Sequence, residues 1–174
     1  MVFTSKNLEK VELRKVMYPG VHAKSHPNKP ALVMSDTGET MTYEELHSYA
    51  EKMANLLQNA GFKAGDHIAL CLENRLEFLP ICWGAHYAGL YYTAISSRLT
   101  APEIEYIIKD CGARAFITSP YKGAEALEVA SEIPDVSLRL CVGGNIDGFD
   151  SLEDLLDQQP LSPVGPRIEG ADML

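Results

Sequence analysis

Two pairs of candidate metal ligands have a spacing of four residues, which on a helix would place both members of a pair on one face. The pairs are His22 with His26 and Cys82 with His86. Imidazole and thiolate groups bind zinc, but a zinc site needs three or four ligands. Pro27 follows His26 directly and makes a helix that holds both histidines doubtful. Because nothing in the sequence brings the two pairs together, we expect no metal-binding residue.

Two glycine-containing segments follow predicted strands and carry groups that bind phosphate in other proteins. Residues 142–148 read VGGNIDG, but no helix start follows them, so we favour a turn over an anion site. Residues 118–123 read TSPYKG, where Lys122 could attract an anion. Here we favour a helix cap at Ser119, because Pro120 removes one amide donor. Neither GxGxxG nor GxxxxGK[ST] occurs in the chain.

Nucleophiles and acid–base pairs are equally hard to assign. The chain has no GxSxG motif, and no serine or cysteine has a histidine and a carboxylate at a familiar spacing. Neighbouring carboxylates lie in or next to predicted helix first turns, where negative charge complements the helix dipole. These are Glu44 with Glu45, Glu103 with Glu105, and Glu153 with Asp154. We therefore predict no catalytic, cofactor-binding or metal-binding residue in these 174 residues.

Composition narrows the class of protein. The chain is 46% hydrophobic and 22% charged, which is ordinary for a globular domain, and its net charge of −9 argues against a nucleic-acid partner. Residues 1–30 are mildly basic and residues 125–174 acidic, which we interpret as solvated surfaces. The four cysteines form no CxxC pair, and the N-terminus lacks a signal-peptide core. We expect a cytoplasmic protein.

One long stretch without charged residues, Phe78 to Ser97, is long enough to span a bilayer. Pro80, Gly84, Gly89 and three tyrosines interrupt it. We interpret it instead as a helix that ends at Gly89, followed by a buried strand.

The helical patterns begin at cap residues and often end at glycine. Thr42 and Glu45 form a capping box before an amphipathic pattern that runs to Gly61, and Thr100 with Glu103 form a second one. Other predicted helices begin at Asn74, Ser119 and Ser151. The patterns after Thr42 and Thr100 have the spacing of a helix that buries one face.

Short apolar runs lie between these helices, and most are continuous rather than alternating, as in strands covered on both faces. They are residues 31–34, 68–72, 91–95, 115–118 and 138–142. Residues 36–38, Asp-Thr-Gly, predict a hairpin turn that forms one small antiparallel pair. Strands alternating with helices predict an α/β fold: a doubly wound, mostly parallel sheet with helices on both faces.

Five segments in order resemble the adenylate-forming enzymes, a superfamily of acyl-CoA synthetases, luciferases and peptide-synthetase adenylation domains. They are MTYEEL (41–46), GDHIAL (65–70), WGAHYAGLYYTAI (83–95), RLTAPEI (98–104) and DCGAR (110–114). The resemblance runs in register from about Pro30 to Thr118. The segment after Gly89 is more similar to fatty-acyl-CoA ligases than to peptide-synthetase domains. Ala94 and Ser96-Ser97 depart from the common family pattern, so the acid activated is not identified.

The resemblance implies a reaction of a carboxylic acid with ATP and CoA, through an acyl-adenylate, with Mg²⁺. In the family, a Ser/Thr/Gly-rich phosphate loop and a C-terminal domain carry this chemistry, and neither occurs in these residues. We therefore expect residues 1–29 to be an N-terminal arm and first helix. Residues 30–159 would form an α/β subdomain of the larger N-terminal domain, and residues 160–174 an extended linker toward the absent phosphate loop.

The leading hypothesis is an N-terminal scaffold fragment of a fatty-acid CoA ligase, inactive alone, whose partner is the remainder of the same polypeptide. The alternative is a self-contained flavodoxin-like binding or interaction module. The sequence leaves open whether the protein forms a homodimer. The arm Met1 to Tyr18 carries Leu8, Val11 and Leu13 among basic residues, which would allow weak peripheral membrane contact, but a packing helix or frayed terminus fits better.

Overall fold

The computed structural model describes residues 18–167 of the chain. Its elements, in order, are α1 (Pro19–Ser25), β1 (Pro30–Val33), β2 (Thr40–Thr42), α2 (Tyr43–Asn59), β3 (His67–Cys71), α3 (Phe78–Tyr87), β4 (Tyr91–Ile95), α4 (Ala101–Asp110), β5 (Ala115–Thr118), the 3₁₀ turn η2 (Pro120–Lys122), α5 (Gly123–Ala130), β6 (Leu138–Cys141), β7 (Asp150–Ser151) and α6 (Leu152–Asp157). Residues 1–17 of the expected N-terminal arm and residues 168–174 of the expected linker lie outside the described residues.

Five strands form one parallel sheet in the order β4-β3-β5-β6-β7. The chain moves from β3 outward to β4 and then returns to the other side of β3 to add β5. This order has a topological switch point between β3 and β5, where α/β proteins of this kind bind ligands beyond the carboxyl ends of the strands. The predicted doubly wound α/β fold is confirmed.

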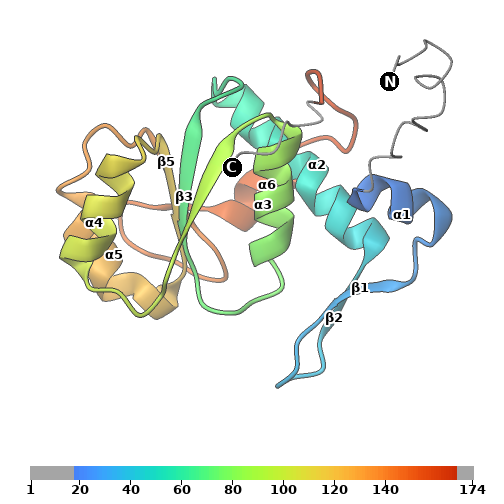
Figure 1. The fold of residues 1–174 in the computed structure, drawn as a ribbon, viewed down its shortest axis with the longest axis horizontal. Coiled ribbons are helices and arrows are strands. Elements are labelled where there is room, and N and C mark those ends of the chain that lie inside the picture. Colours follow the sequence, from blue (N-terminus) through green and yellow to red (C-terminus); the bar gives the residue numbers. More distant parts are fainter. Residues whose placement is uncertain (1–17, 168–174) are drawn as a thin grey trace, which may run out of the picture.

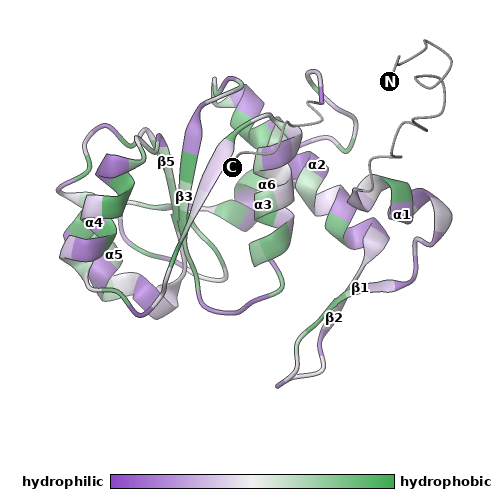
Figure 2. Cartoon of the chain, viewed as in Figure 1, coloured by the Kyte–Doolittle hydropathy of each residue, from purple (hydrophilic) through white to green (hydrophobic). Residues whose placement is uncertain are grey.

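Helices cover both faces of the sheet, as Figure 1 shows, with α4 and α5 on one side and α2, α3 and α6 on the other. Successive strand residues point to opposite faces, so neighbours in one strand belong to different cores. In β3, Ile68 and Leu70 pack with α2 and α3, whereas Ala69 and Cys71 pack with α4 and α5. Figure 2 shows that these helices carry both hydrophobic and hydrophilic residues, and the buried apolar ones belong to the two cores.

Local signals act as the sequence predicts at several helix ends. Thr42 with Glu45 and Thr100 with Glu103 form complete capping boxes, and Ser151 accepts a hydrogen bond from the amide of Asp154. The predicted pair around residues 36–38 is an antiparallel hairpin of β1 and β2, with Gly38 at φ +76°. This hairpin projects from the body of the molecule (Figure 1).

Two predictions about single elements are wrong, and a third, at Ser119, holds only in part. The second helix begins at Phe78 rather than at Asn74, and its N-cap residue Glu77 makes no side-chain capping bond. Ser119 takes the N-cap position before Pro120, as predicted, but its side chain makes no capping bond, and the turn that follows is the 3₁₀ turn η2 before α5 begins at Gly123. Strand β4 is not buried: it is the edge strand, and Tyr91 and Tyr92 are 39% and 43% exposed.

The charge-free stretch from residue 78 to 97 divides into α3, a turn at Gly89 and β4, as predicted. Gly89 has φ +75°, a left-handed conformation that favours glycine after a helix. Over residues 18–167, no helix combines the length and the apolar character needed to cross a bilayer.

Candidate functional site

The loops that follow β3, β5 and β6 meet at the carboxyl end of the sheet, beside the switch point. The hydroxyl of Thr118, the last residue of β5, donates a hydrogen bond of 2.9 Å to the carbonyl oxygen of Cys71, the last residue of β3. Both side chains are buried. This bond fixes the two strand ends on which the loops are built.

Arg75, in the loop between β3 and α3, is the centre of a charged network at this edge. Its Nε donates to Glu77 at 2.9 Å, and its Nη1 donates to Glu73 at 3.3 Å and to the carbonyl oxygen of Val142 at 3.0 Å. Glu73 also accepts a hydrogen bond of 2.5 Å from Ser119. The network therefore joins the loops after β3, β5 and β6.

The charges in this network compensate one another. Burial alone would lower the pKa of Arg75, but its pairing with Glu77 and Glu73 outweighs burial and raises that pKa. Burial would likewise raise the pKa of Glu77, but the hydrogen bonds and charge of Arg75 outweigh it and lower that pKa. Arg75 stays a cation held by two carboxylates, so it has little charge left to offer an anionic ligand.

The predicted turn at residues 142–148 lies against this network. Gly143 has φ +72°, a backbone conformation that favours glycine, and a Cβ there would lie 2.4 Å from Nη2 of Arg75 and would displace the guanidinium. Its amide donates to Glu153 at 2.8 Å. Because that amide is already bonded and no helix begins in the turn, the segment is not arranged as a phosphate-binding loop.

Tyr49 of α2 brings its hydroxyl into the same electrostatic environment. The hydroxyl is buried and has no hydrogen-bond partner within residues 18–167. Burial, followed by the charges of Glu77 and Glu153, raises its pKa. Tyr49 therefore stays neutral over the physiological range.

The segment 118–123 has a structural role in the described chain. Ser119 donates to Glu73, as described above, and Lys122 is buried, where it donates to the carbonyl oxygen of Leu99 at 3.1 Å and pairs with Glu125. Ser119 thus stands at the predicted N-cap position, but its hydroxyl binds a loop carboxylate rather than the amides of the helical turn. The carboxylate of Glu125 compensates the charge of Lys122, so this ammonium group is not available to an anionic ligand.

The candidate metal pairs remain apart. His22 lies in α1, and His26 lies just beyond its end, in agreement with the doubt about a shared helix. The rings of His22 and Tyr43 stack at 4.8 Å, and His86 lies edge-on to Trp83 at 5.4 Å. Within residues 18–167, no group of three or more His, Cys, Asp or Glu side chains could hold a metal ion.

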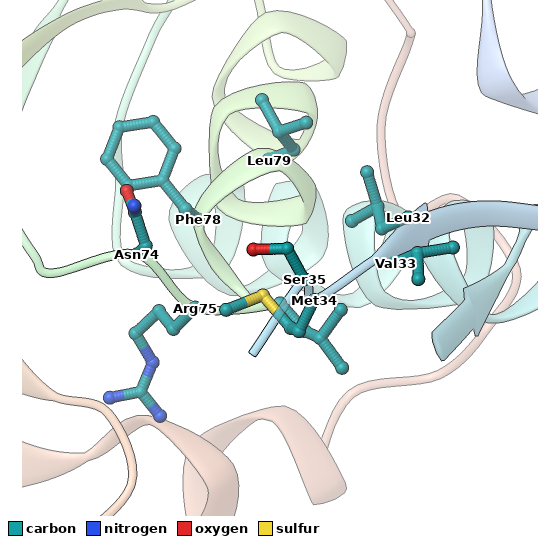
Figure 3. Close-up of a pocket in the computed structure, with 9 residues that line it drawn as sticks. Leu32, Val33, Met34, Ser35, Asn74, Arg75, Phe78 and Leu79 are labelled. Atoms are coloured by element: carbon teal, nitrogen blue, oxygen red, sulfur yellow. The ribbon is translucent and has the colours of Figure 1, made fainter. Parts of the chain in front are cut away.

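An open groove of about 340 Å³ separates the end of β1 from the start of α3 (Figure 3). Its walls are mainly aliphatic, and Val33 and Leu79 are 62% and 45% exposed. In Figure 3, Arg75 extends away from Leu32, Val33 and Leu79. The groove therefore combines apolar walls with a cation that is already paired.

Sequence reasoning missed the Arg75 network. The only signal for it is local, an arginine with a glutamate two residues before it and another two residues after it. The contacts with Ser119 and Val142 join residues 46 and 67 positions apart. No pattern in the sequence predicts these contacts.

The fold places the chain among the doubly wound α/β proteins, and comparison with known proteins then names its family. The family model described as "AMP-binding enzyme" matches residues 21–169. The chain belongs to this family, and the resemblance to adenylate-forming enzymes is confirmed.

Two curated relatives and one solved structure illustrate the relationship. Human long-chain fatty acid transport protein 1 is 29% identical over 143 residues, which cover 79% of this chain and 22% of the relative. The long-chain-fatty-acid–CoA ligase FadD13 of Mycobacterium tuberculosis is 34% identical over 91 residues, covering 52% and 18%. The inhibitor-bound N-terminal domain of FACL13 from Mycobacterium tuberculosis aligns with a TM-score of 0.75 at 25% identity, covering 87% of this chain and 36% of that one.

The chain spans about a fifth of the length of these curated relatives. The ATP that the family uses would need donors for its phosphates, and the paired groups of the Arg75 network and its neighbours do not fit that need. Arg75 and Lys122 are paired with carboxylates, and the Gly143 amide is bonded to Glu153. We therefore assign no nucleotide contact to Arg75, Lys122 or the Gly143 amide.

Proposed function

We propose that these residues are the N-terminal portion of a fatty-acid CoA ligase. The complete enzyme would convert a carboxylic acid, ATP and CoA into acyl-CoA, AMP and pyrophosphate through an acyl-adenylate. The observation that carries the proposal is the family match over residues 21–169, supported by relatives named as fatty-acid ligases. Within that enzyme, the present sheet is a scaffold.

The chain alone is expected to be inactive. The strongest support is chemical: at the carboxyl end of the sheet, Arg75 and Lys122 are held by carboxylates and carbonyl oxygens, and electrostatic stabilisation of adenylyl transfer requires donors aimed at the phosphates. ATP, Mg²⁺, CoA and the fatty acid would then be bound by further residues of the longer polypeptide, which is the partner of this scaffold.

ATP–pyrophosphate exchange with a fatty acid tests both statements. A longer chain that continues into a Ser/Thr/Gly-rich phosphate loop should catalyse exchange, whereas residues 1–174 should give no signal above the enzyme-free rate. Exchange by residues 1–174 would refute the scaffold role, and an inactive longer chain would refute the ligase proposal.

A flavodoxin-like binding module is the second candidate, since the strand order is the one found in flavodoxin. The paired charges at the switch point weigh against it, because a flavin phosphate would meet the glutamates that bind Arg75. Saturable binding in a flavin mononucleotide titration would favour the module.

We propose a cytoplasmic location for the ligase. Cell fractionation would test for peripheral membrane contact, and size-exclusion chromatography would test for a homodimer.

A further inference from the structure

The segment that follows α6 lies against one stripe of α2. The stripe is formed by Glu51 and by Asn55, Gln58 and Asn59, which follow it by four, seven and eight residues. At these spacings the four side chains share one helix face. Residues 160–167 have no regular secondary structure, as expected of a linker, yet their main chain is held along this face.

Asn55 makes every hydrogen bond its side chain can make, and all of them go to this segment. Its Nδ2 donates to the carbonyl oxygens of Pro160 at 2.7 Å and Ser162 at 3.0 Å. Its Oδ1 accepts from the amide of Val164 at 3.0 Å and from Arg167 at 2.6 Å. Asn55 is fully buried, so loss of these bonds would leave polar atoms without partners.

Arg167 closes the arrangement at its far end. Its Nε donates to Glu51 at 2.7 Å, its Nη1 to the side-chain oxygen of Gln58 at 2.9 Å, and its Nη2 to Asn55. The side chains of Arg167 and Glu51 are only 18% and 11% exposed. A guanidinium can make these bonds together because its donors are arranged as a planar fork, which an ammonium group lacks.

Two further contacts set how closely the segment approaches. Gln58 donates to the carbonyl oxygen of Pro166 at 3.1 Å, and a Cβ at Gly165 would lie 2.9 Å from the Gln58 side-chain oxygen. The segment is therefore held at successive points from residue 160 to residue 167, and its course along α2 is fixed.

We propose that Asn55 and Arg167 are positioning residues that fix the point and direction in which the polypeptide leaves the α/β unit after residue 167. The inference rests on the proposed ligase function, in which the phosphate-binding segment follows. A misplacement of about 1 Å can reduce the rate of an enzyme roughly a hundredfold, so a fixed exit from the scaffold matters to a segment that must meet ATP.

The first test uses residues 1–174 and amide hydrogen exchange. The Val164 amide should be protected in the unchanged chain, and its exchange should be roughly tenfold faster in Asn55→Ala, which removes its acceptor. Because Asn55 is buried and this variant could fail to fold, Arg167→Gln, at the margin of the unit, serves as the second variant. Lys52→Gln is the matched control, since it removes the Lys52–Asp157 pair from the same helix and should leave Val164 protected.

The second test uses a longer chain with the phosphate loop. Arg167→Gln should raise the KM for ATP roughly tenfold per folded enzyme while leaving the KM for the fatty acid unchanged, and Arg167→Lys should restore part of the loss. A purely structural role would lower thermal stability without this split.

The outcomes separate the two proposals. An unprotected Val164 amide in the unchanged chain, or unaltered kinetics in Arg167→Gln, would overturn the positioning role. A longer unchanged chain that shows no ATP–pyrophosphate exchange would overturn the ligase function alone. The amide hydrogen exchange of Val164 would still decide whether the segment is held on α2.

Discussion

The guanidinium of Arg75 donates a hydrogen bond of 3.0 Å to the main-chain carbonyl oxygen of Val142. Arg75 lies in the loop after β3 and Val142 in the loop after β6, and these two strands are separated by β5 in the sheet. The contact thus links loops of strands that are not neighbours. It makes the carboxyl end of the sheet a single connected structure rather than a set of separate loops.

Replacement of Arg75 should destabilise the fold. Arg75→Gln removes the charge partner of Glu73 and Glu77, whose side chains are 30% and 28% exposed, so we expect a loss of about 1–3 kcal/mol in the free energy of unfolding. Urea unfolding measures it. Arg98→Gln is the control, since within residues 18–167 the Arg98 side chain makes no hydrogen bond or ion pair, and it should change the free energy by less than about 0.5 kcal/mol. Equal stability of Arg75→Gln and the unchanged chain would contradict the structural role of the network.

Gly84 should resist substitution although it lies inside a helix, where alanine is normally favoured. A Cβ at Gly84 would lie 2.4 Å from Cβ of Met53, so Gly84→Ala must push α3 away from α2 and should destabilise by about 1–3 kcal/mol. Gly123→Ala is the control, because Gly123 has helical backbone angles and a Cβ there meets nothing within 4 Å. It should leave stability unchanged or raise it by about 0.4–1 kcal/mol. Thermal unfolding of both variants gives the comparison, and a stabilised Gly84→Ala would show that the two helices are not in close contact.

Stability should fall when the solution is made mildly acidic, partly because of His47. Burial lowers the pKa of His47, and the positive charges of Lys24 and Arg167 add to the effect while Glu51 opposes it. The unfolded chain therefore binds a proton at higher pH than the folded one. The contribution of His47 is complete above its unfolded pKa of about 6.5 and is lost as the pH falls through the lower folded pKa.

Urea unfolding between about pH 5 and 7.5 measures this effect against His47→Gln, which lacks the titrating group. The variant should lose part of the slope of stability with pH. An identical slope in the two proteins would contradict a buried His47. In Arg167→Gln, the pKa of His47 should rise, because one of the charges that lowers it is removed.

The cysteines should differ in reactivity toward a thiol reagent. Burial raises the pKa of Cys71 to about 11 and that of Cys82 to about 12, and the thiolate is the reactive form. Cys141 is also buried, whereas Cys111 is only half-buried. At pH 8 we expect native protein to react mainly at Cys111, and all four thiols to react after unfolding. Cys111→Ser should remove the native reaction, and rapid native labelling of Cys82 would contradict its placement in the core.

Sequence patterns predict the regular elements of this fold well, for a local reason. A capping box and an amphipathic spacing involve residues within a few positions of each other, as in Thr42 with Glu45, and such signals survive without knowledge of the rest of the chain. The order of strands and helices then limits the fold to a doubly wound sheet. The exposure of β4 could not be predicted, because the composition of residues 91–95, YYTAI, does not reveal that they form the edge strand.

The sequence by itself determined the fold class, the helix caps, the hairpin turn and, through five ordered segments, the family. Tertiary structure alone decided that Arg75, Ser119 and Val142 meet at the switch point and that Asn55 holds residues 160–167. The Asn55 contacts join positions more than a hundred residues apart. Hydrogen bonds need partners within about 3 Å with the right direction, and only the packing of helices on the sheet brings such distant groups to that distance.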